Sequence, residues 1–241
     1  EKVSSIGIVN PLTKQSWLFD ARPDFPSQYR ILTENHNTEL VGIFLTHAHM
    51  GHYTGLLHLG REVMGKKNVP VYVMLRMKRF LETNGPWSQL VTLKNINLKL
   101  IENNKYIKIG EQLFIEPFLV PHRDEYFETV GYLIIGKEKS LAFIPDIDKW
   151  EKWHGSIFQL VLNTDILLLD GTFFSQNEIL HRNMAEIPPP FITESMETLS
   201  ELNSESRNKV HFTHYNRSNP AIKNNNPAYH TIKSKRFNLA G

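Results

Sequence analysis

Five short apolar runs of this chain are each followed closely by a histidine or an aspartate. The runs are Val41 to Leu45, Phe118 to Val120, Leu141 to Ile144, Ile166 to Leu169 and Val210 to Phe212, and the polar residues after them are, in order, His47, His122, Asp146, Asp170 and His214. Short apolar runs of this kind predict buried strands. Ligand sites in layered α/β proteins form outside the carboxyl ends of strands. The pattern therefore predicts a metal site at the edge of a sheet.

The other apolar runs complete an α/β pattern without a linker or a repeat, which predicts one domain over residues 1–241. Those runs are Val3 to Val9, Trp17 to Phe19, Val69 to Met74, Ile96 to Ile101, Leu113 to Val120 and Val130 to Ile135. Helices are expected from a Thr54 cap to Gly65, over Arg76 to Thr83, from an Asp148 cap to Phe158, and over Thr193 to Leu202. The stretch from Asn219 onward is weakly patterned, which predicts irregular structure.

Composition narrows the class of protein. The 241 residues carry a net charge of +2, so we expect no nucleic-acid partner. No apolar run reaches the roughly 18 to 20 residues of a membrane-spanning helix, so we expect a soluble protein of the cytoplasm or periplasm. The chain has no cysteine, which excludes disulfides, thiolate zinc ligands and a cysteine nucleophile.

The densest group of candidate ligands is His47, His49 and His52, within six residues of one another. They lie between a predicted buried strand and a predicted helix, so their imidazoles can converge on one point. Neutral imidazole is a common ligand for zinc and also suits iron. Surface histidines in a solvated loop are the alternative, and this spacing favours a metal site over it.

The run His47-Ala48-His49-Met50-Gly51-His52, followed in order by His122, Asp146 and His214, resembles the metallo-β-lactamase fold superfamily. Within it the chain looks most like the protein B branch of pyrroloquinoline quinone biosynthesis. The supporting segments are Leu45 to His47, Gly51 to Leu56, Leu169 to Phe173 and Phe212 to Pro220. The resemblance implies an αββα sandwich of two mixed sheets flanked by helices. It also implies a further strand before Glu1.

The resemblance implies a role for each matched residue. His47, His49 and His122 match a three-histidine metal site, Asp146 matches a carboxylate that bridges two metals, and His52 and His214 match the second site. Gly51 departs from the hydrolytic branches, which usually carry a metal-binding aspartate at this position. A tight turn that needs an unusual backbone conformation would also explain this glycine.

The favoured function is a metal-dependent hydrolase. One or two Zn²⁺ would hold a hydroxide that attacks a small-molecule ester, lactone or phosphodiester. Asp146, His214 and Asp170 are the residues expected to take part in catalysis. Asp170 would orient a ligand histidine, and a simple turn residue before Gly171 is its alternative.

Two other functions stay open. Without an aspartate at Gly51, the second position keeps His52, His214 and Asp146, the ligand set of a non-haem Fe²⁺ oxygenase. The intact three-histidine site favours the hydrolase over this alternative. A metal-binding protein without catalysis is the third hypothesis. Tyr53 and Tyr215, which each follow a predicted ligand, either present a hydroxyl to substrate or simply pack.

Overall fold

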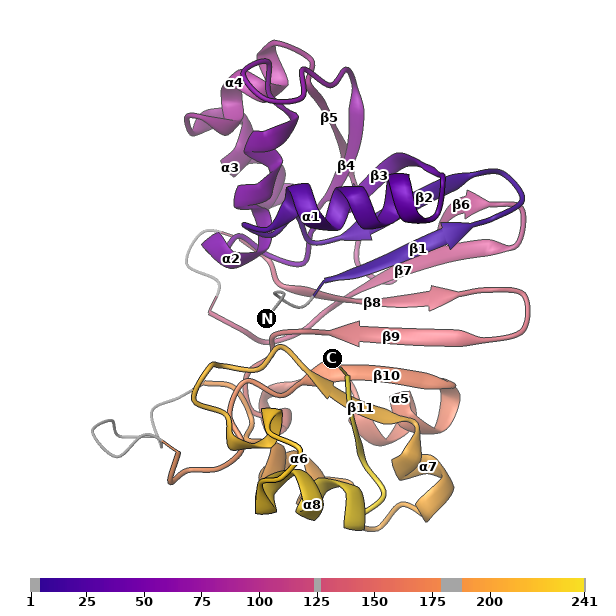
Figure 1. Ribbon diagram of the computed structural model, residues 1–241, viewed down its shortest axis with the longest axis vertical. Helices are drawn as coiled ribbons and strands as arrows, with labels where there is room; N and C mark the ends of the chain where they lie inside the picture. Colours follow the sequence, from indigo (N-terminus) through magenta and orange to yellow (C-terminus); the bar gives the residue numbers. More distant parts are fainter. Residues whose placement is uncertain (1–4, 124–126, 179–187, 241) are drawn as a thin grey trace. The chain divides into compact units, whose positions relative to one another are not determined.

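The computed structural model describes residues 5–123, 127–178 and 188–240, which form two compact units. Of the described residues, unit 1 comprises 5–102 and 127–128. Unit 2 comprises 103–123, 129–178 and 188–240. Each unit contains one β-sheet with helices beside it (Figure 1). The predicted class, two mixed sheets flanked by helices, is confirmed, and the single domain stays a prediction.

Unit 1 is built on a five-stranded sheet with the order β1-β2-β3-β4-β5. Its strands are β1 (Ile6–Asn10), β2 (Gln15–Phe19), β3 (Glu39–Phe44), β4 (Val69–Val73) and β5 (Ile96–Leu100). The β1–β2 pair is antiparallel, and β2 to β5 run parallel. Parallel strands end at the same edge of a sheet, so the residues that follow β2 and β3 come together there.

The helices of unit 1 pack on this sheet through apolar side chains. They are α1 (Phe25–Arg30), a π-helix (Ile31–Asn35), α2 (Met50–Tyr53), a 3₁₀-helix (Thr54–Leu59), α3 (Leu75–Thr83) and α4 (Trp87–Thr92). The buried core includes Ile43 and Val71 from the strands, and Phe25, Leu56 and Leu81 from the helices. This core fixes the ends of β2 and β3 against α2.

Unit 2 is built on a seven-stranded sheet with the order β12-β11-β10-β9-β8-β7-β6. Its strands are β6 (Ile107–Gly110), β7 (Leu113–Leu119), β8 (Val130–Ile135), β9 (Ser140–Ile144), β10 (Ile166–Asp170), β11 (Val210–Thr213) and β12 (Asn238–Leu239). Strands β6 to β9 form an antiparallel meander, and β9 to β12 are parallel. The ends of β9, β10 and β11 therefore lie at one edge.

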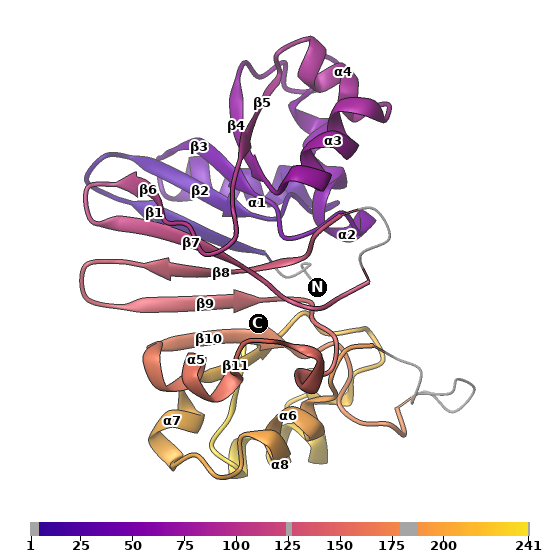
Figure 2. The ribbon, with the colours of Figure 1, turned by 180° about the vertical axis from the view of Figure 1, so that it is seen from behind.

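Short helices accompany the parallel half of this sheet (Figure 2). They are a 3₁₀-helix (Trp150–Lys152), α5 (Ile157–Asn163), α6 (Ile192–Thr198), α7 (Ser204–Asn208), a 3₁₀-helix (Pro220–Ile222) and α8 (Pro227–Ser234). Val161, Met196 and Ile232 from three of the helices join Leu169 and Phe212 of the strands in one buried cluster. The cluster holds the carboxyl ends of β10 and β11 in place.

All ten predicted apolar runs overlap strands and each predicted helix overlaps a helical segment, but both predicted helix caps were wrong. Thr54 does not cap a helix, because its hydroxyl donates to the Met50 carbonyl at 2.8 Å and α2 already begins at Met50. Asp148 caps no helix either, since the side chain of Ser156 caps α5. The stretch after Asn219, predicted to be irregular, contains α8, which begins with an Asn226 cap and Pro227.

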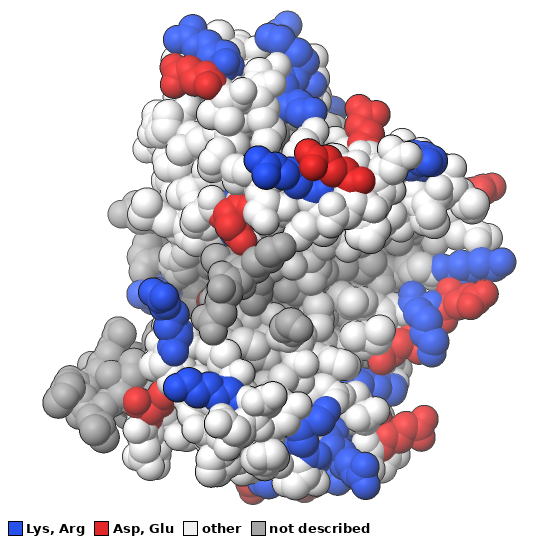
Figure 3. All heavy atoms as spheres, in the orientation of Figure 1, with Lys and Arg blue, Asp and Glu red and all other residues white. Residues whose placement is uncertain are grey.

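The described surface and helices give two further findings. Among the residues that the structure describes, no helix is both long and apolar enough to cross a membrane. Basic and acidic side chains are interspersed on the face shown in Figure 3, in keeping with the small net charge of +2.

Candidate metal centre

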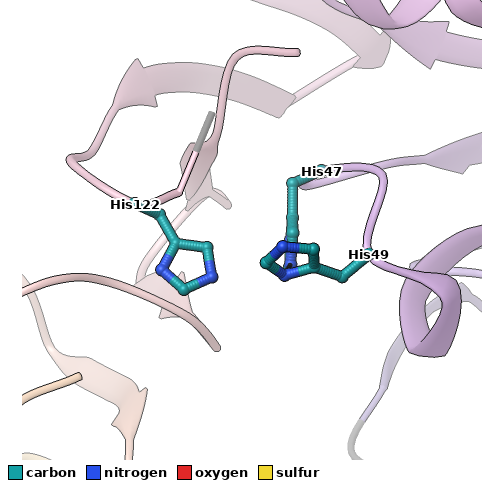
Figure 4. Close-up of side chains that lie close together, drawn as sticks. All are labelled: His47, His49 and His122. Atoms are coloured by element: carbon teal, nitrogen blue, oxygen red, sulfur yellow. Dashed lines mark hydrogen bonds between the residues drawn. The ribbon is translucent and has the colours of Figure 1, made fainter. Parts of the chain in front are cut away.

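The loop after β3 brings the first predicted ligands together. His47 is fully buried, and its Nε2 atom lies 2.9 Å from Nδ1 of His49 (Figure 4). His49 occupies the N-cap position of α2 with an extended backbone, which turns its ring back toward His47. Two ring nitrogens that point at each other from neighbouring residues suit one shared metal ion.

His52, on α2, is held in a defined orientation through its Nδ1 atom. That atom lies 2.8 Å from Oδ2 of Asp20 and 3.5 Å from the hydroxyl of Thr46. The carboxylate can only accept, so Nδ1 of His52 carries the proton in this contact. The Nε2 atom of His52 is then the one with a lone pair for a metal. A carboxylate behind a histidine ligand is the usual outer partner in metal sites.

Asp20 and Arg22 contact His52 and were not predicted from the sequence. Asp20 directly follows β2 and is fully buried; its Oδ1 accepts from the Thr46 backbone N–H at 2.8 Å. The guanidinium of Arg22, which is only 1% exposed, lies 3.1 Å from Nδ1 of His52 and 3.9 Å from Oδ2 of Asp20. Asp20 follows an apolar run just as His47 does, so the rule that located the other candidates could have found it.

In unit 2, Asp146 lies between two histidines. Its Oδ1 atom is 3.9 Å from Nε2 of His122, and its Oδ2 atom is 3.5 Å from Nε2 of His214. Both distances exceed the usual hydrogen-bond length. Two ligands at about 2.0–2.1 Å from one tetrahedral zinc lie about 3.4 Å apart. Each carboxylate oxygen of Asp146 thus faces one histidine at a separation that suits two metal positions, one for each pair.

The outer nitrogens of these two histidines also contact oxygen atoms. Nδ1 of His122 lies 3.3 Å from a carboxylate oxygen of Asp148. Nδ1 of His214 lies 3.2 Å from the hydroxyl of Thr172, and this hydroxyl donates to Oδ1 of Asp170 at 2.7 Å. Asp148 was interpreted as a helix cap, and its contact with His122 replaces that role. Asp170 acts on His214 through Thr172 rather than by direct contact.

Asp170 is fully buried, and this burial shifts the pKa of its carboxyl group. Burial raises the pKa of Asp170 well above its usual range, and the nearby Asp146 carboxylate raises it further. The backbone N–H and hydroxyl of Thr172, and the N–H of Ile147, oppose this rise by donating to the carboxylate. A carboxyl group in this setting suits a structural role behind the ligands.

Two residues of the site have left-handed backbones, which L-residues other than glycine rarely adopt. The φ angle is 64° at Asp20 and 62° at His214. Such conformations cost about 1–3 kcal/mol and persist where the surrounding structure enforces them. Six other non-glycine residues of the described chain, all outside the site, share this backbone. The positions of the Asp20 and His214 side chains therefore each depend on a strained turn at a strand end.

Gly51 needs no unusual backbone. It is the second residue of α2, its φ lies outside the left-handed range, and a Cβ atom built on it meets nothing within 4 Å. The explanation by a tight turn is therefore wrong. A Cβ atom has room at this position, so lack of space does not explain the glycine.

The two tyrosines have different surroundings. The ring of Tyr53 is 4% exposed and packs on Trp87 with 4.7 Å between ring centroids, and burial raises the pKa of its hydroxyl. The Tyr215 hydroxyl donates to the Phe212 carbonyl, and burial raises its pKa strongly. Packing therefore describes Tyr53, and Tyr215 stabilises the turn that carries His214.

The predicted ligands thus form two sets. Unit 1 gathers His47, His49 and His52, and unit 2 gathers Asp146 with His122 and His214. All these donors are imidazoles or carboxylates, the groups that zinc and iron accept. Their role as metal ligands stays a prediction.

Comparison with known proteins gives the relationships of the chain. The sequence profile of the Beta-lactamase superfamily domain matches residues 16–215. Coenzyme PQQ synthesis protein B from Methylococcus capsulatus is 24% identical, with 94% of this chain and 82% of that protein covered.

Two solved structures share the fold. The structure of Zn²⁺-bound PqqB from Methylobacterium extorquens has a TM-score of 0.78 at 20% identity and covers 98% of this chain and 83% of its own. A diphosphatase of the PhnP family has a TM-score of 0.59 at 18% identity, with 94% and 76% covered.

Proposed function

Since the chain belongs to the beta-lactamase superfamily, we propose that it is a zinc-dependent hydrolase with the predicted histidines and Asp146 as its zinc ligands. The observation that carries this proposal is the position of Asp146. Its two oxygens face Nε2 of His122 and Nε2 of His214, each near the spacing of two ligands on one metal ion, so Asp146 would be a ligand at two metal positions. A PqqB that binds Zn²⁺ shares the fold, which supports zinc as the ion.

His47, His49 and His122 would hold the first zinc, His52 and His214 would hold the second, and Asp146 would be a ligand of both. When bound, zinc lowers the pKa of a coordinated water to about 7 and polarises a carbonyl or phosphoryl oxygen. The donor set fits the ion, because the contacts at Nδ1 of His52, His122 and His214 place the ring proton there and the lone pair of each imidazole on Nε2.

The residues behind the ligands maintain this arrangement. Asp20 holds the proton on Nδ1 of His52, so this imidazole presents its lone pair at Nε2. Thr172 transmits the position of Asp170 to His214. A small-molecule ester, lactone or phosphodiester is the proposed substrate. The phosphodiester gains support from the diphosphatase that shares the fold.

Metal content and turnover test the proposal together. We expect one to two zinc ions per chain after expression with zinc and iron, and hydrolysis of at least one member of an ester, lactone and phosphodiester panel. A His47→Ala and His49→Ala double variant should lose tightly bound zinc, whereas His154→Ala, at an exposed histidine, should keep it. Unchanged zinc content in the double variant would contradict the proposed site.

An iron-dependent oxygenase is a second candidate, and Gly51 is the observation that favours it. Space for an aspartate exists at this position, yet the chain has none there. His52, His214 and Asp146 then match the two-histidine, one-carboxylate set of non-haem iron oxygenases. About one iron per chain, together with oxygen consumption in the presence of aromatic or peptide substrates, would favour this candidate over the hydrolase.

A further inference from the structure

The connection between β7 and β8 carries His122 and ends in two residues that belong to unit 1. The backbone N–H of Val120 donates to the carbonyl of Thr129 at 3.0 Å, which closes the base of this connection within unit 2. Phe127 and Glu128, just before Thr129, are part of unit 1. The same connection therefore holds a predicted ligand and a point of attachment.

Phe127 is embedded in unit 1 beside the first two ligands. Its side chain is 1% exposed, and its ring meets the His49 ring edge-on with 5.9 Å between centroids. The centroid of the His47 ring lies 6.3 Å away, and that of Phe80, on α3, lies 6.4 Å away. Burial of a phenylalanine side chain removes a large apolar area from water, so this contact is a strong attachment.

Glu128 makes a second attachment at the start of α3. Both of its carboxylate oxygens accept from the backbone N–H of Arg76, at 3.0 and 3.2 Å. Met74, at the N-cap of α3, has no side-chain oxygen to cap the helix. Glu128 therefore provides the cap from a distant part of the chain, and its negative charge also suits the positive end of the helix dipole.

Chain length links these attachments to the metal ligand. His122 precedes Phe127 by five residues, and five residues span at most about 18 Å when fully extended. A chain fixed at Phe127 therefore limits the distance of His122 from this anchor to about that length. Fixing this chain in advance also reduces the conformational entropy that metal binding must otherwise overcome.

We propose that Phe127 and Glu128 are positioning residues that hold the His122 connection in reach of His47 and His49 and thereby set the affinity of the first metal position. Neither residue is a ligand. The inference rests on the proposed function, because it needs His122 to bind the same ion as His47 and His49.

Zinc competition titrations on the full chain test the inference. We expect Phe127→Ala and Glu128→Ala each to weaken tight zinc binding about ten- to hundredfold, the size of effect seen for outer partners of metal ligands. Glu128→Gln should keep most of the affinity, because its amide oxygen can still accept from Arg76. Phe237→Ala is the matched control, since Phe237 is also 1% exposed but packs on Phe212 in unit 2.

Cobalt substitution adds a readout that a general loss of stability does not change. The intense visible bands of four-coordinate cobalt should weaken in Phe127→Ala and Glu128→Ala, measured where circular dichroism shows both variants folded. If Phe127→Ala does not fold, Glu128→Ala alone decides. Wild-type zinc affinity in Glu128→Ala, or an equal loss in Phe237→Ala, would overturn the inference.

His122→Ala separates this inference from the proposed function. If His122→Ala leaves zinc affinity unchanged, the proposed metal site is wrong. If His122→Ala weakens zinc binding and the Phe127 and Glu128 variants do not, the site stands and only their positioning role is refuted.

Discussion

Replacement of Asp20 by asparagine tests whether a buried carboxylate orients the second set of imidazoles. Asparagine has the same shape and tolerates the left-handed backbone found here, φ 64°, so the change alters charge and hydrogen bonding rather than conformation. Asp20 accepts from the Thr46 backbone at 2.8 Å and contacts Nδ1 of His52 at 2.8 Å. Arg22 lies 3.9 Å away and would remain as a buried cation.

The structure gives the size of the effect. Each hydrogen bond to a charged group contributes about 1.5–3 kcal/mol. Removal of one partner from a buried ion pair costs about 3–5 kcal/mol, because the other charge is left without compensation. Asparagine keeps one acceptor oxygen, so we expect Asp20→Asn to lower the free energy of unfolding by about 3–5 kcal/mol. Zinc affinity at the second position should fall about ten- to hundredfold.

Urea unfolding without metal measures the first effect, and zinc competition measures the second. Asp165→Asn is the control, since Asp165 pairs with Lys139 and Ser140 at the surface, and this variant should keep wild-type zinc affinity. A folded Asp20→Asn protein with wild-type stability and two wild-type zinc affinities would refute the role assigned to Asp20.

Three further predictions concern single residues. Gly51→Asp should raise metal occupancy toward two per chain by elemental analysis, because a side chain fits at this position; unchanged occupancy would mean that a missing carboxylate does not limit the second position. Thr172→Val, which removes the hydroxyl between Asp170 and His214, should destabilise the protein by about 1–3 kcal/mol and weaken zinc binding at the second position. Thr172→Ser, which keeps a hydroxyl, is the control. Equal zinc affinity in the wild type and both variants would contradict the role of this hydroxyl. Burial, and to a smaller extent the charge of Lys233, lower the pKa of His211 below 6.5, so the unfolded chain binds a proton before the folded protein does as the pH falls. The stability contributed by neutral His211 should therefore be complete above about pH 6.5 and decline below it. His211→Gln should flatten this decline in urea unfolding midpoints measured from about pH 7.5 to 5. An unchanged slope would show that His211 does not contribute.

Most strands were predictable because a buried strand appears in the sequence as a short run of apolar residues. Runs such as Val69 to Met74 and Ile166 to Leu169 are apolar because most of their side chains are buried or half-buried in these strands. Strand β6 (Ile107–Gly110), with a lysine and a glycine, shows no such run and was missed. The short helices were harder, because a helix of four to seven residues has too few positions to show a period of 3.6.

The candidate ligands were predictable to the same extent, since strand order places strand-end residues at one edge. Their outer partners were not, because those contacts depend on tertiary structure. Asp20 meets His52 across 32 residues, and Asp148 meets His122 across 26. The interpretation of Asp148 as a helix cap failed for this reason. A polar residue before a helical pattern looks like a cap in the sequence, and the sequence does not show that its carboxylate contacts a distant histidine instead.

Each unit contains the same arrangement of a buried aspartate, a threonine hydroxyl and an imidazole. In unit 1 the hydroxyl of Thr46 lies between Asp20 and the imidazoles of His47 and His52, and in unit 2 the hydroxyl of Thr172 lies between Asp170 and His214. A hydroxyl can both donate and accept, so it donates to the carboxylate and still has a lone pair for a ring N–H. Each array also contains one left-handed residue, the aspartate in unit 1 and the histidine in unit 2. Such backbones carry a cost of about 1–3 kcal/mol, and here they fix the direction of one side chain at each strand end. What the two arrays share is a buried aspartate that orients an imidazole through a hydroxyl, as the outer partners of metal ligands do.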